Sequence, residues 1–314
     1  MKKVITLLVL CVTLLSLVAC QTDTPTNSTT LPGASTPPVS GEKNAIPYQS
    51  DLVSGKFSEF DLETACGLFT GDLVYSDAGI TFTGNGATIS GTVATITKPG
   101  CYRVSGNSTD GQLVISVTSL EKVHLVFSGL TLTCQNSAPL MVANADKVCV
   151  TLAKDTVNTL SDGASFGTGA DAPNACIYAK DSITFNGEGS LVVNANLHNG
   201  IDCSNDLKFV SGHYQVKAAN NAIKGNDSVA ILHATMTIEA GKDAIKSDTI
   251  NDPTKGFVYI ASGTFTITAT DDGIQATTAI ELQGGRFTMA CDGKTINSKD
   301  GLHISEQVVI ENVN

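Results

Sequence analysis

The sequence has no tryptophan and few other aromatic residues, which restricts how it could bind a ligand. Only 5% of its 314 residues are aromatic, and six of these are tyrosines. Modules that grip flat, crystalline polymers present rows of exposed aromatic rings with a large apolar contact area. Most phenylalanines here fall instead at alternating strand positions, such as Phe265 and Phe287, where a core side chain is expected. An aromatic binding platform is therefore not predicted.

Long apolar runs are also missing, apart from one at the start of the chain. Residues 1–19 combine two lysines with a short apolar stretch, which is typical of a secretory signal and not of a spanning helix. The signal ends in Leu17-Val18-Ala19-Cys20, which resembles the bacterial lipobox, with Cys20 as the lipid-bearing first residue of the mature chain. Residues 20–47 are rich in Thr, Pro and Ser and are predicted to form a disordered tether. Residues 48–314 are the predicted folded domain.

These features predict a lipoprotein of the bacterial cell envelope that faces away from the cytoplasm and touches the membrane only through its anchor.

Positive charge is scarce, with 19 Lys and Arg against 30 Asp and Glu and a net charge of −11. Removing the signal with Lys2 and Lys3 gives −11 − 2 = −13. Nucleic acid and anionic membrane surfaces attract basic proteins, so neither is an expected partner.

The cysteines show no metal-binding spacing. Of nine, Cys11 lies in the signal and Cys20 is the anchor, which leaves seven. Seven is odd, so at least one is unpaired, and no CxxC or Cys/His cluster is present in the sequence, which argues against a zinc site. We expect these seven to be buried within the solenoid, and the sequence leaves their pairing open: Cys66, Cys101, Cys134, Cys149, Cys176, Cys203 and Cys291.

A short phrase recurs in the second half of the chain. A small, polar or acidic residue precedes Gly or Ala and then Ile, in residues 199–201, 221–223, 243–245 and 272–274, and less clearly in 294–296. The isoleucines are separated by 22, 22, 29 and 22 residues, since 223 − 201 = 22 and 274 − 245 = 29. A fixed period in this range indicates a solenoid, in which each unit buries its apolar face against its neighbours.

Within one repeat the apolar residues alternate, as in residues 257–260 and 265–268. Alternation in Val, Ile, Thr and Phe is typical of half-buried strands, and Gly, Asn and Asp mark the turns between them. No helix with a 3.6-residue period is predicted after the signal. The prediction is an all-β protein, a parallel β-helix of about ten coils with three strands per coil. Its inward ladder consists of Ile177, Ile201, Ile223, Ile245, Ile274 and Ile296.

The repeat is interrupted and weakens toward the N-terminus. Leu140 is expected to occupy the same inward position as Ile177, with an insertion at residues 161–173 between them. A second insertion, of 29 − 22 = 7 residues, falls between Lys246 and Phe257. Residues 72–133 are less regular and are predicted to form early coils and an N-terminal cap. The last segment shows no evident cap, which predicts an exposed edge.

Stacking the coils aligns the polar residues that precede each isoleucine. Asn199, Asn221, Asp243 and Asp272 form one predicted column, and Asp202, Lys224 and Lys246 follow the isoleucines. The asparagines suit a ladder of side-chain amides. Two stacked carboxylates repel each other, so either neighbouring lysines or a bound cation should neutralise them. Calcium takes six to eight oxygen ligands, and the expected ligands are Asn221, Asp243, Asp271, Asp272, Asp248 and Asp252.

Several segments resemble a known bacterial family. They are ATITKPGCYRVSG (residues 94–106), NADKV (144–148), NANLHNGI (194–201) and TDDGIQA (270–276). In the same order they resemble secreted proteins described as carbohydrate-binding domain-containing, related to a cellulose- and polygalacturonate-binding β-helix protein of plant-degrading bacteria. The resemblance implies a right-handed, pectate-lyase-like parallel β-helix that binds calcium and acidic plant polysaccharide. Lyase activity is not a family trait, so the likeness to pectate lyases is architectural.

The leading hypothesis is a non-catalytic, calcium-dependent binder of polygalacturonate or pectin, with cellulose as a further ligand. Lys224, Lys246, Asn199 and Asp202 are the predicted substrate-binding residues, and calcium is the predicted cofactor. One alternative is a surface adhesin or structural solenoid without a sugar ligand. A second is a polysaccharide lyase in which Lys224 or Lys246 removes the proton that calcium acidifies.

Overall fold

The computed structural model describes residues 55–163, 165–167, 169 and 172–313. Over this part the protein is nearly all β, which confirms the predicted class: strands form one sheet of 18 and another of 10. One feature not predicted is a single-turn helix, α1 (Glu59–Leu62), capped reciprocally by Ser58 and Asp61. No helix in these residues is long and apolar enough to cross a membrane. The predicted signal, Cys20 and the tether lie outside the described residues.

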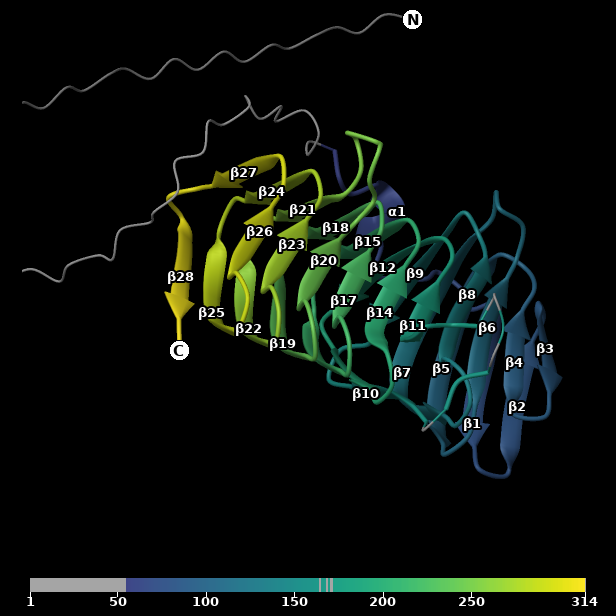
Figure 1. Ribbon diagram of the computed structural model, residues 1–314. Helices are drawn as coiled ribbons and strands as arrows, with labels where there is room; N and C mark the ends of the chain where they lie inside the picture. Colours follow the sequence, from purple (N-terminus) through teal and green to yellow (C-terminus); the bar gives the residue numbers. More distant parts are fainter. Residues whose placement is uncertain (1–54, 164, 168, 170–171, 314) are drawn as a thin grey trace, which may run out of the picture. The chain divides into compact units, whose positions relative to one another are not determined.

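The ten-stranded sheet contains one short strand from each coil (Figure 1). All of its pairings are parallel except the terminal β3–β4 hairpin. Its strands are β3 (Ala87–Ser90), β4 (Val93–Ile96), β6 (Gln112–Ser116), β8 (Leu140–Asn144), β11 (Ala175–Ala179), β14 (Asn199–Cys203), β17 (Ile223–Gly225), β20 (Ile245–Ser247), β23 (Ile274–Ala276) and β26 (Ile296–Ser298).

The 18-stranded sheet folds into two rows of parallel strands. One row, here the covered row, comprises β9 (Lys147–Leu152), β12 (Ser182–Gly187), β15 (Asp206–Phe209), β18 (Ser228–Ile231), β21 (Phe257–Ile260), β24 (Ala279–Leu282) and β27 (Gly301–Ile304). The other, here the open row, comprises β10 (Val157–Asp162), β13 (Ser190–Ala195), β16 (His213–Ala218), β19 (Ala234–Ala240), β22 (Gly263–Ala269), β25 (Gly285–Cys291) and β28 (Val308–Asn312).

The rows join at one end of the stack. The long strand β7 (Lys122–Cys134) pairs with both β9 and β10, and β5 (Gly100–Ser108) pairs along it. Beyond β5 the chain closes with an antiparallel hairpin of β1 (Gly71–Ser76) and β2 (Gly79–Gly84). The opposite end finishes on β28, whose only partner among the described strands is β25. Residues 72–133 thus include irregular early coils and hairpins, as the weaker repeat suggested.

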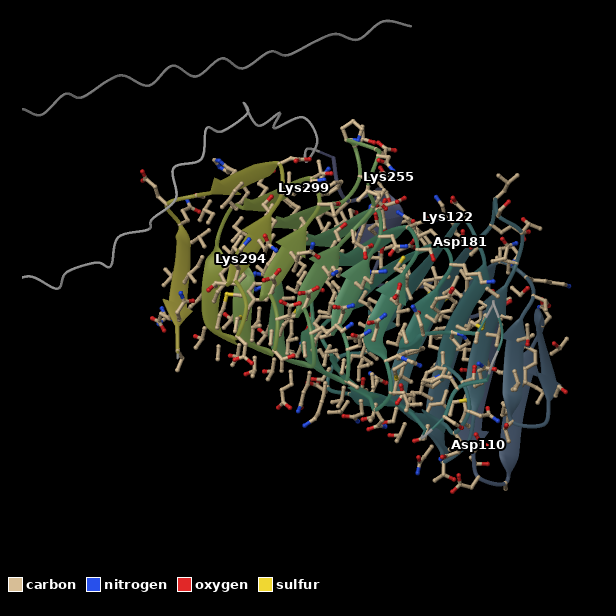
Figure 2. All side chains as sticks on the ribbon, in the orientation of Figure 1. Asp110, Lys122, Asp181, Lys255, Lys294 and Lys299 are labelled. Carbon is tan, nitrogen blue, oxygen red and sulfur yellow. A yellow bond between two sulfur atoms is a disulfide. The ribbon has the colours of Figure 1, made fainter. Side chains whose placement is uncertain are left out.

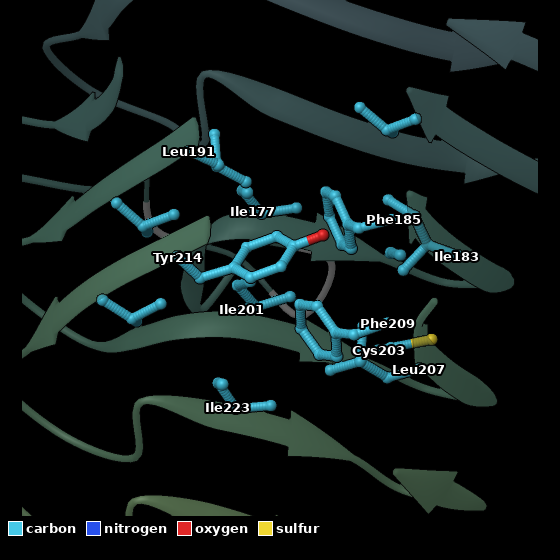
Figure 3. Packing of buried hydrophobic residues seen from close by; sticks show 14 of the residues in the cluster. Ile177, Ile183, Phe185, Leu191, Ile201, Cys203, Leu207, Phe209, Tyr214 and Ile223 are labelled. Carbon is cyan, nitrogen blue, oxygen red and sulfur yellow. The ribbon is translucent and has the colours of Figure 1, made fainter. Parts of the chain in front are cut away.

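The isoleucine ladder lies where the repeat predicted it. Ile177, Ile201, Ile223, Ile245 and Ile274 pair in register through successive strands, and Leu140 precedes them. All five isoleucines are fully buried, and Figure 3 shows three of them beside the stacked rings of Phe185 and Phe209. The last member, Ile296, is only half-buried, a correction to the prediction. No further coil stacks on β26 within the described residues, which explains its exposure.

A segment near the N-terminus lies across the covered row. We refer to residues 55–66, which include α1, as the strap. Cys66 forms a disulfide with Cys101 on β5, a pairing that the sequence left open. Of the other five cysteines in the described residues, all are free; four are buried as expected, and Cys291 is half-buried. His124 lies within 4.8 Å of both bonded sulfurs, but the disulfide already occupies them.

Candidate functional site

The predicted polar column forms along the edge of the ten-stranded sheet. Asn199 begins β14, and the other three members lie two residues before β17, β20 and β23: Asn221, Asp243 and Asp272. All four side chains are buried, with residue exposures of 3–8%. Each lies two residues before a ladder isoleucine, so the register of the isoleucines stacks them. The repeat in the sequence is therefore sufficient to bring these four residues together.

One side-chain oxygen of each column residue accepts a hydrogen bond from a backbone N–H of the next coil. Asn199 Oδ1 accepts from the Asn221 nitrogen at 3.1 Å, and Asn221 Oδ1 accepts from the Asp243 nitrogen at 3.3 Å. Asp243 Oδ1 accepts from the Asp272 nitrogen at 3.1 Å, and Asp272 Oδ1 from the Lys294 nitrogen at 2.8 Å. The column is thus a continuous hydrogen-bonded ladder that fixes one oxygen per coil.

The ladder becomes acidic toward the C-terminal coils. Carboxylate oxygens of Asp243, Asp271 and Asp272 lie within 4.8 Å of one another, with the first and third buried and Asp271 exposed. Lys246 Nζ lies 2.7 Å from Asp243 Oδ2, and Asn297 Nδ2 lies 2.5 Å from Asp272 Oδ2. Lys246 therefore pairs directly with one of the three carboxylates, and Lys294 Nζ contacts Asn297, the residue that binds Asp272. Both alternatives for neutralisation, a lysine and a cation, thus have a structural basis.

A row of polar side chains faces outward beside the column. Asp202, Lys224, Lys246, Gln275 and Asn297 are register partners on successive strands. Lys224 Nζ lies 3.3 Å from Asp248 and 3.9 Å from Asp202. Asn199 Nδ2 donates to Asp202 Oδ2 at 2.7 Å. Burial raises the pKa of the Asp202 carboxyl, although Lys224 and Asn199 oppose the shift.

The two insertion aspartates do not join the three-carboxylate cluster. Asp248 faces Lys224, as given above, and Asp252 accepts hydrogen bonds from the nitrogen and hydroxyl of Thr254 in its own turn. The insertion instead walls a groove with a volume of about 390 Å³, which Ile250, Asp252, Thr277 and Lys299 help to line. Figure 2 shows Lys255 on the projecting insertion and Lys299 on a nearby turn.

The structure adds two residues that the sequence did not point to, Asn297 and Gly293, and gives a new feature to Gln275, which the repeat places in the row after the isoleucines. Gln275 has a buried side-chain oxygen without a hydrogen-bond partner among the described residues. Asn297 reaches Asp272, and Gly293 packs so closely that a Cβ there would lie 2.8 Å from Asp272 Oδ1. Gln275 and Asn297 follow column positions by three residues, the spacing of Asp243 and Lys246. This three-residue separation was the signal in the sequence that could have placed them beside the column. The sequence does not show the geometry of the intervening turn, so it could not show which side chains meet.

Comparison with known proteins agrees with this architecture. A solved structure, the polysaccharide lyase-like protein from C. thermocellum as a gadolinium derivative, is 36% identical and superposes with a TM-score of 0.75. The match covers 77% of this chain and 99% of that one. The fold is thus that of a nearly all-β, polysaccharide lyase-like protein whose parallel sheet is nearly closed.

The family follows from the sequence matches. The model of carbohydrate-binding domain-containing proteins matches residues 90–314. A protein of that description from Acetivibrio thermocellus is 38% identical over 226 residues, covering 71% of this chain and 79% of the relative. The chain belongs to this carbohydrate-binding domain-containing family, as the resemblance of its repeat phrases indicated.

Proposed function

We propose that this protein binds an acidic plant polysaccharide such as polygalacturonate through a calcium ion, without cleaving it. The observation that carries the proposal is the cluster of Asp243, Asp271 and Asp272, whose carboxylate oxygens lie within 4.8 Å of one another. Family membership supports a carbohydrate as the ligand. The acidic cluster and the nearby lysines support the finer statement that calcium bridges the protein to a uronate.

The donor set fits a calcium ion. Calcium prefers carboxylate and amide oxygens at 2.3–2.6 Å, and the cluster offers three carboxylates. Gln275 follows Asp272 by three residues, and its unpartnered buried oxygen is an amide carbonyl, the other kind of ligand that calcium takes. Lys246 holds one oxygen of Asp243, so calcium would displace its ammonium group. A displaced Lys246, next to Lys224 in the outward row, would then be free to pair with a polymer carboxylate.

We further propose that the stacked coils form a right-handed parallel β-helix, because parallel strand connections are right-handed in about 98% of cases. The lipobox at Cys20 supports a lipid-anchored protein on the outside of the bacterial cell envelope.

A polysaccharide lyase is the second candidate, since the solved relative is lyase-like. Such a reaction needs a basic side chain free to accept a proton beside the cation. Lys224 lies 3.3 Å from Asp248, and the Lys246 that calcium would displace is proposed above to pair with a polymer carboxylate, so neither ammonium group is left to act as the base. Binding without cleavage is therefore the better supported function. Unsaturated uronide products, detected by their ultraviolet absorbance, would establish the lyase instead.

The direct test is affinity for polygalacturonate, measured by calorimetry with calcium and then with excess EGTA. We expect binding with calcium and its loss with the chelator. Equal binding in both conditions would show that calcium does not bridge the polymer. Absence of binding in both, with retained folding, would favour a surface adhesin without a sugar ligand.

A further inference from the structure

The last coil of the stack, β26 to β28, is apolar on the side where a further coil would lie. Leu302 and Ile304 on β27 are in register with Ile280 and Leu282 of the preceding coil, which are fully buried. Leu302 and Ile304 are instead 51% and 41% exposed, and Ile296 on β26 is half-buried. Side chains at core positions therefore face solvent at this end.

The three strands of this coil also have an unpaired outer edge. Among the described strands, β26 pairs only with β23, β27 only with β24, and β28 only with β25. Figure 1 shows the three strands together at one end of the stack. The backbone groups along such an edge are a template for pairing with another strand. The last coil therefore combines an open apolar core with three open strand edges.

The other end of the stack does not match this coil. It is closed by the antiparallel hairpins β1–β2 and β3–β4, which reverse the direction of the last strand in each sheet. Within the described residues it presents no coil of three parallel strands that a second copy could continue. A head-to-tail fibre, which a non-closing contact would produce, is therefore disfavoured. The surface that matches one open coil is the open coil of another copy.

We infer that two copies of this chain associate through their last coils, about a two-fold axis perpendicular to the stack, to form a reversible dimer. From β26 to the end of β28 the coil rises by one strand spacing, roughly 4.8 Å. An axis through the middle strand, β27, sets the low strand of each copy against the high strand of the other, so one spacing fits along the whole edge. β27 then pairs with its own equivalent and β26 with β28, all antiparallel.

The register of the dimer follows from which side chains point inward. Residues directly opposite each other in a sheet lie on the same face. An axis centred on His303 therefore places Leu302 of one copy opposite Ile304 of the other, and both point toward the core. In the same way Ile296 meets Ile310, an inward residue of β28. The exposed ends of two cores become one continuous core, and removal of this apolar surface from water drives the association.

Charges at the turns of the last coil are complementary in this arrangement. The axis brings the turn before β27 of one copy, with the exposed Lys299, against the turn after β27 of the other, with the exposed Glu306. Figure 2 shows Lys299 near the open end. The contact occurs twice in the dimer, once for each copy. Opposite charges at both contacts favour this orientation, and salt screens the repulsion between more distant charges of two acidic chains.

Dimerisation does not require the proposed function, because the interface lies on strand edges and not on the acidic cluster. A dimer carries two such clusters and could hold one polymer at two points, which raises its apparent affinity. At low protein concentration the single chain predominates, and Ile296 keeps the partial exposure described above.

The test is the mass of the purified full chain in solution, measured by sedimentation velocity over a series of protein concentrations. We expect conversion of monomer to dimer as the concentration rises, and no larger species. Ile304→Lys buries a charge in the interface and should weaken the dimer about ten-fold or more. It should fold, since this side chain is already 41% exposed. The matched control, Leu120→Lys, alters an 89% exposed leucine outside the last coil and should dimerise as the unaltered chain does.

A charge-reversal cycle tests the two-fold geometry itself. Lys299→Glu sets like charges against each other at two contacts and should weaken the dimer about ten-fold. Glu306→Lys should do the same, whereas the double variant K299E/E306K should dimerise as the unaltered chain does, because each contact again joins opposite charges.

A chain that stays monomeric at all concentrations would overturn the inference. So would growth beyond the dimer, or a dimer that Ile304→Lys leaves unchanged, which would place the contact elsewhere in the chain. A double variant that dimerises no better than the single ones would show that Lys299 and Glu306 do not meet, and would overturn the two-fold arrangement.

Discussion

At the scale of single residues, the stacking of Asp243 and Asp272 is the feature that needs compensation. Their backbone register forces the two carboxylates into adjacent coils, and each is buried. Backbone N–H groups satisfy one oxygen of each, and Lys246 and Asn297 contact the other. Asparagine at the equivalent positions 199 and 221 avoids the repulsion. Aspartate in place of asparagine in the later coils puts negative charge at the proposed cation site.

Replacing one of the clustered carboxylates should therefore weaken calcium binding. For Asp243→Asn and Asp272→Asn we expect at least a ten-fold rise in the calcium dissociation constant, because a charged ligand becomes a neutral one. Asp252→Asn is the control, since Asp252 is bonded within its own turn. Isothermal titration with calcium measures all three. A larger effect of Asp252→Asn than of Asp243→Asn would place the ion in the insertion.

At the scale of elements, the strap is held by a buried charge. Asp61 is fully buried and receives hydrogen bonds from Thr184 at 2.6 Å and from Lys147 at 2.9 Å, while Lys208 lies 3.4 Å away. Burial by itself would raise the pKa of the Asp61 carboxyl. The bonds from Thr184, Ser58 and Lys147 and the charge of Lys208 outweigh it and lower the pKa well below 3.8. The strap is thus docked by an ionised group.

This clamp predicts a specific acid sensitivity. A carboxyl whose folded-state pKa is lowered stabilises the fold above its ordinary pKa, and that stabilisation is lost as pH falls below about 4. Asp61→Asn should destabilise the protein by about 3–5 kcal/mol at neutral pH, because Lys147 and Lys208 lose their buried partner. Thermal unfolding from neutral to acidic pH measures both effects. An Asp61→Asn variant with the unaltered chain's stability at neutral pH would contradict the clamp.

At the scale of the whole molecule, the stack of coils implies that position along the stack sets the cost of a defect. Each coil contacts only its neighbours, so a residue in a middle coil has packing on both sides and one in a terminal coil on one side. Ile223 is fully buried, whereas Ile296 is half-buried at the end of the ladder. The same substitution should therefore have different consequences at these two sites.

We expect Ile223→Asn to cost about 3–5 kcal/mol, because it removes a buried side chain and leaves an amide without partners. Ile296→Asn should cost well under half as much, since solvent can hydrate the new amide. Urea unfolding of the two variants measures the difference. Equal destabilisation would mean that the last coil is covered as completely as the middle ones.

The repeat phrases could be converted into structure because a fixed period demands stacking. The positions of the isoleucines from Ile201 onward follow from the spacing of the repeat and its one insertion, and so does the column of Asn199, Asn221, Asp243 and Asp272. Leu140 and Ile177 align through the similar residues around them, across an insertion, and they are register partners. Asp248 and Asp252 could not be placed in the same way. They lie in an insertion outside the period, so their side chains depend on local turns and on Lys224.

By itself the sequence determined the strand class, the stacking partners and the polar column, because these depend on period and alternation, which are local properties of the chain. Only the tertiary structure decided that Cys66 meets Cys101 and that Asp61 meets Lys147 and Lys208. These contacts join segments with no common repeat, so their geometry depends on where the strap crosses the sheet.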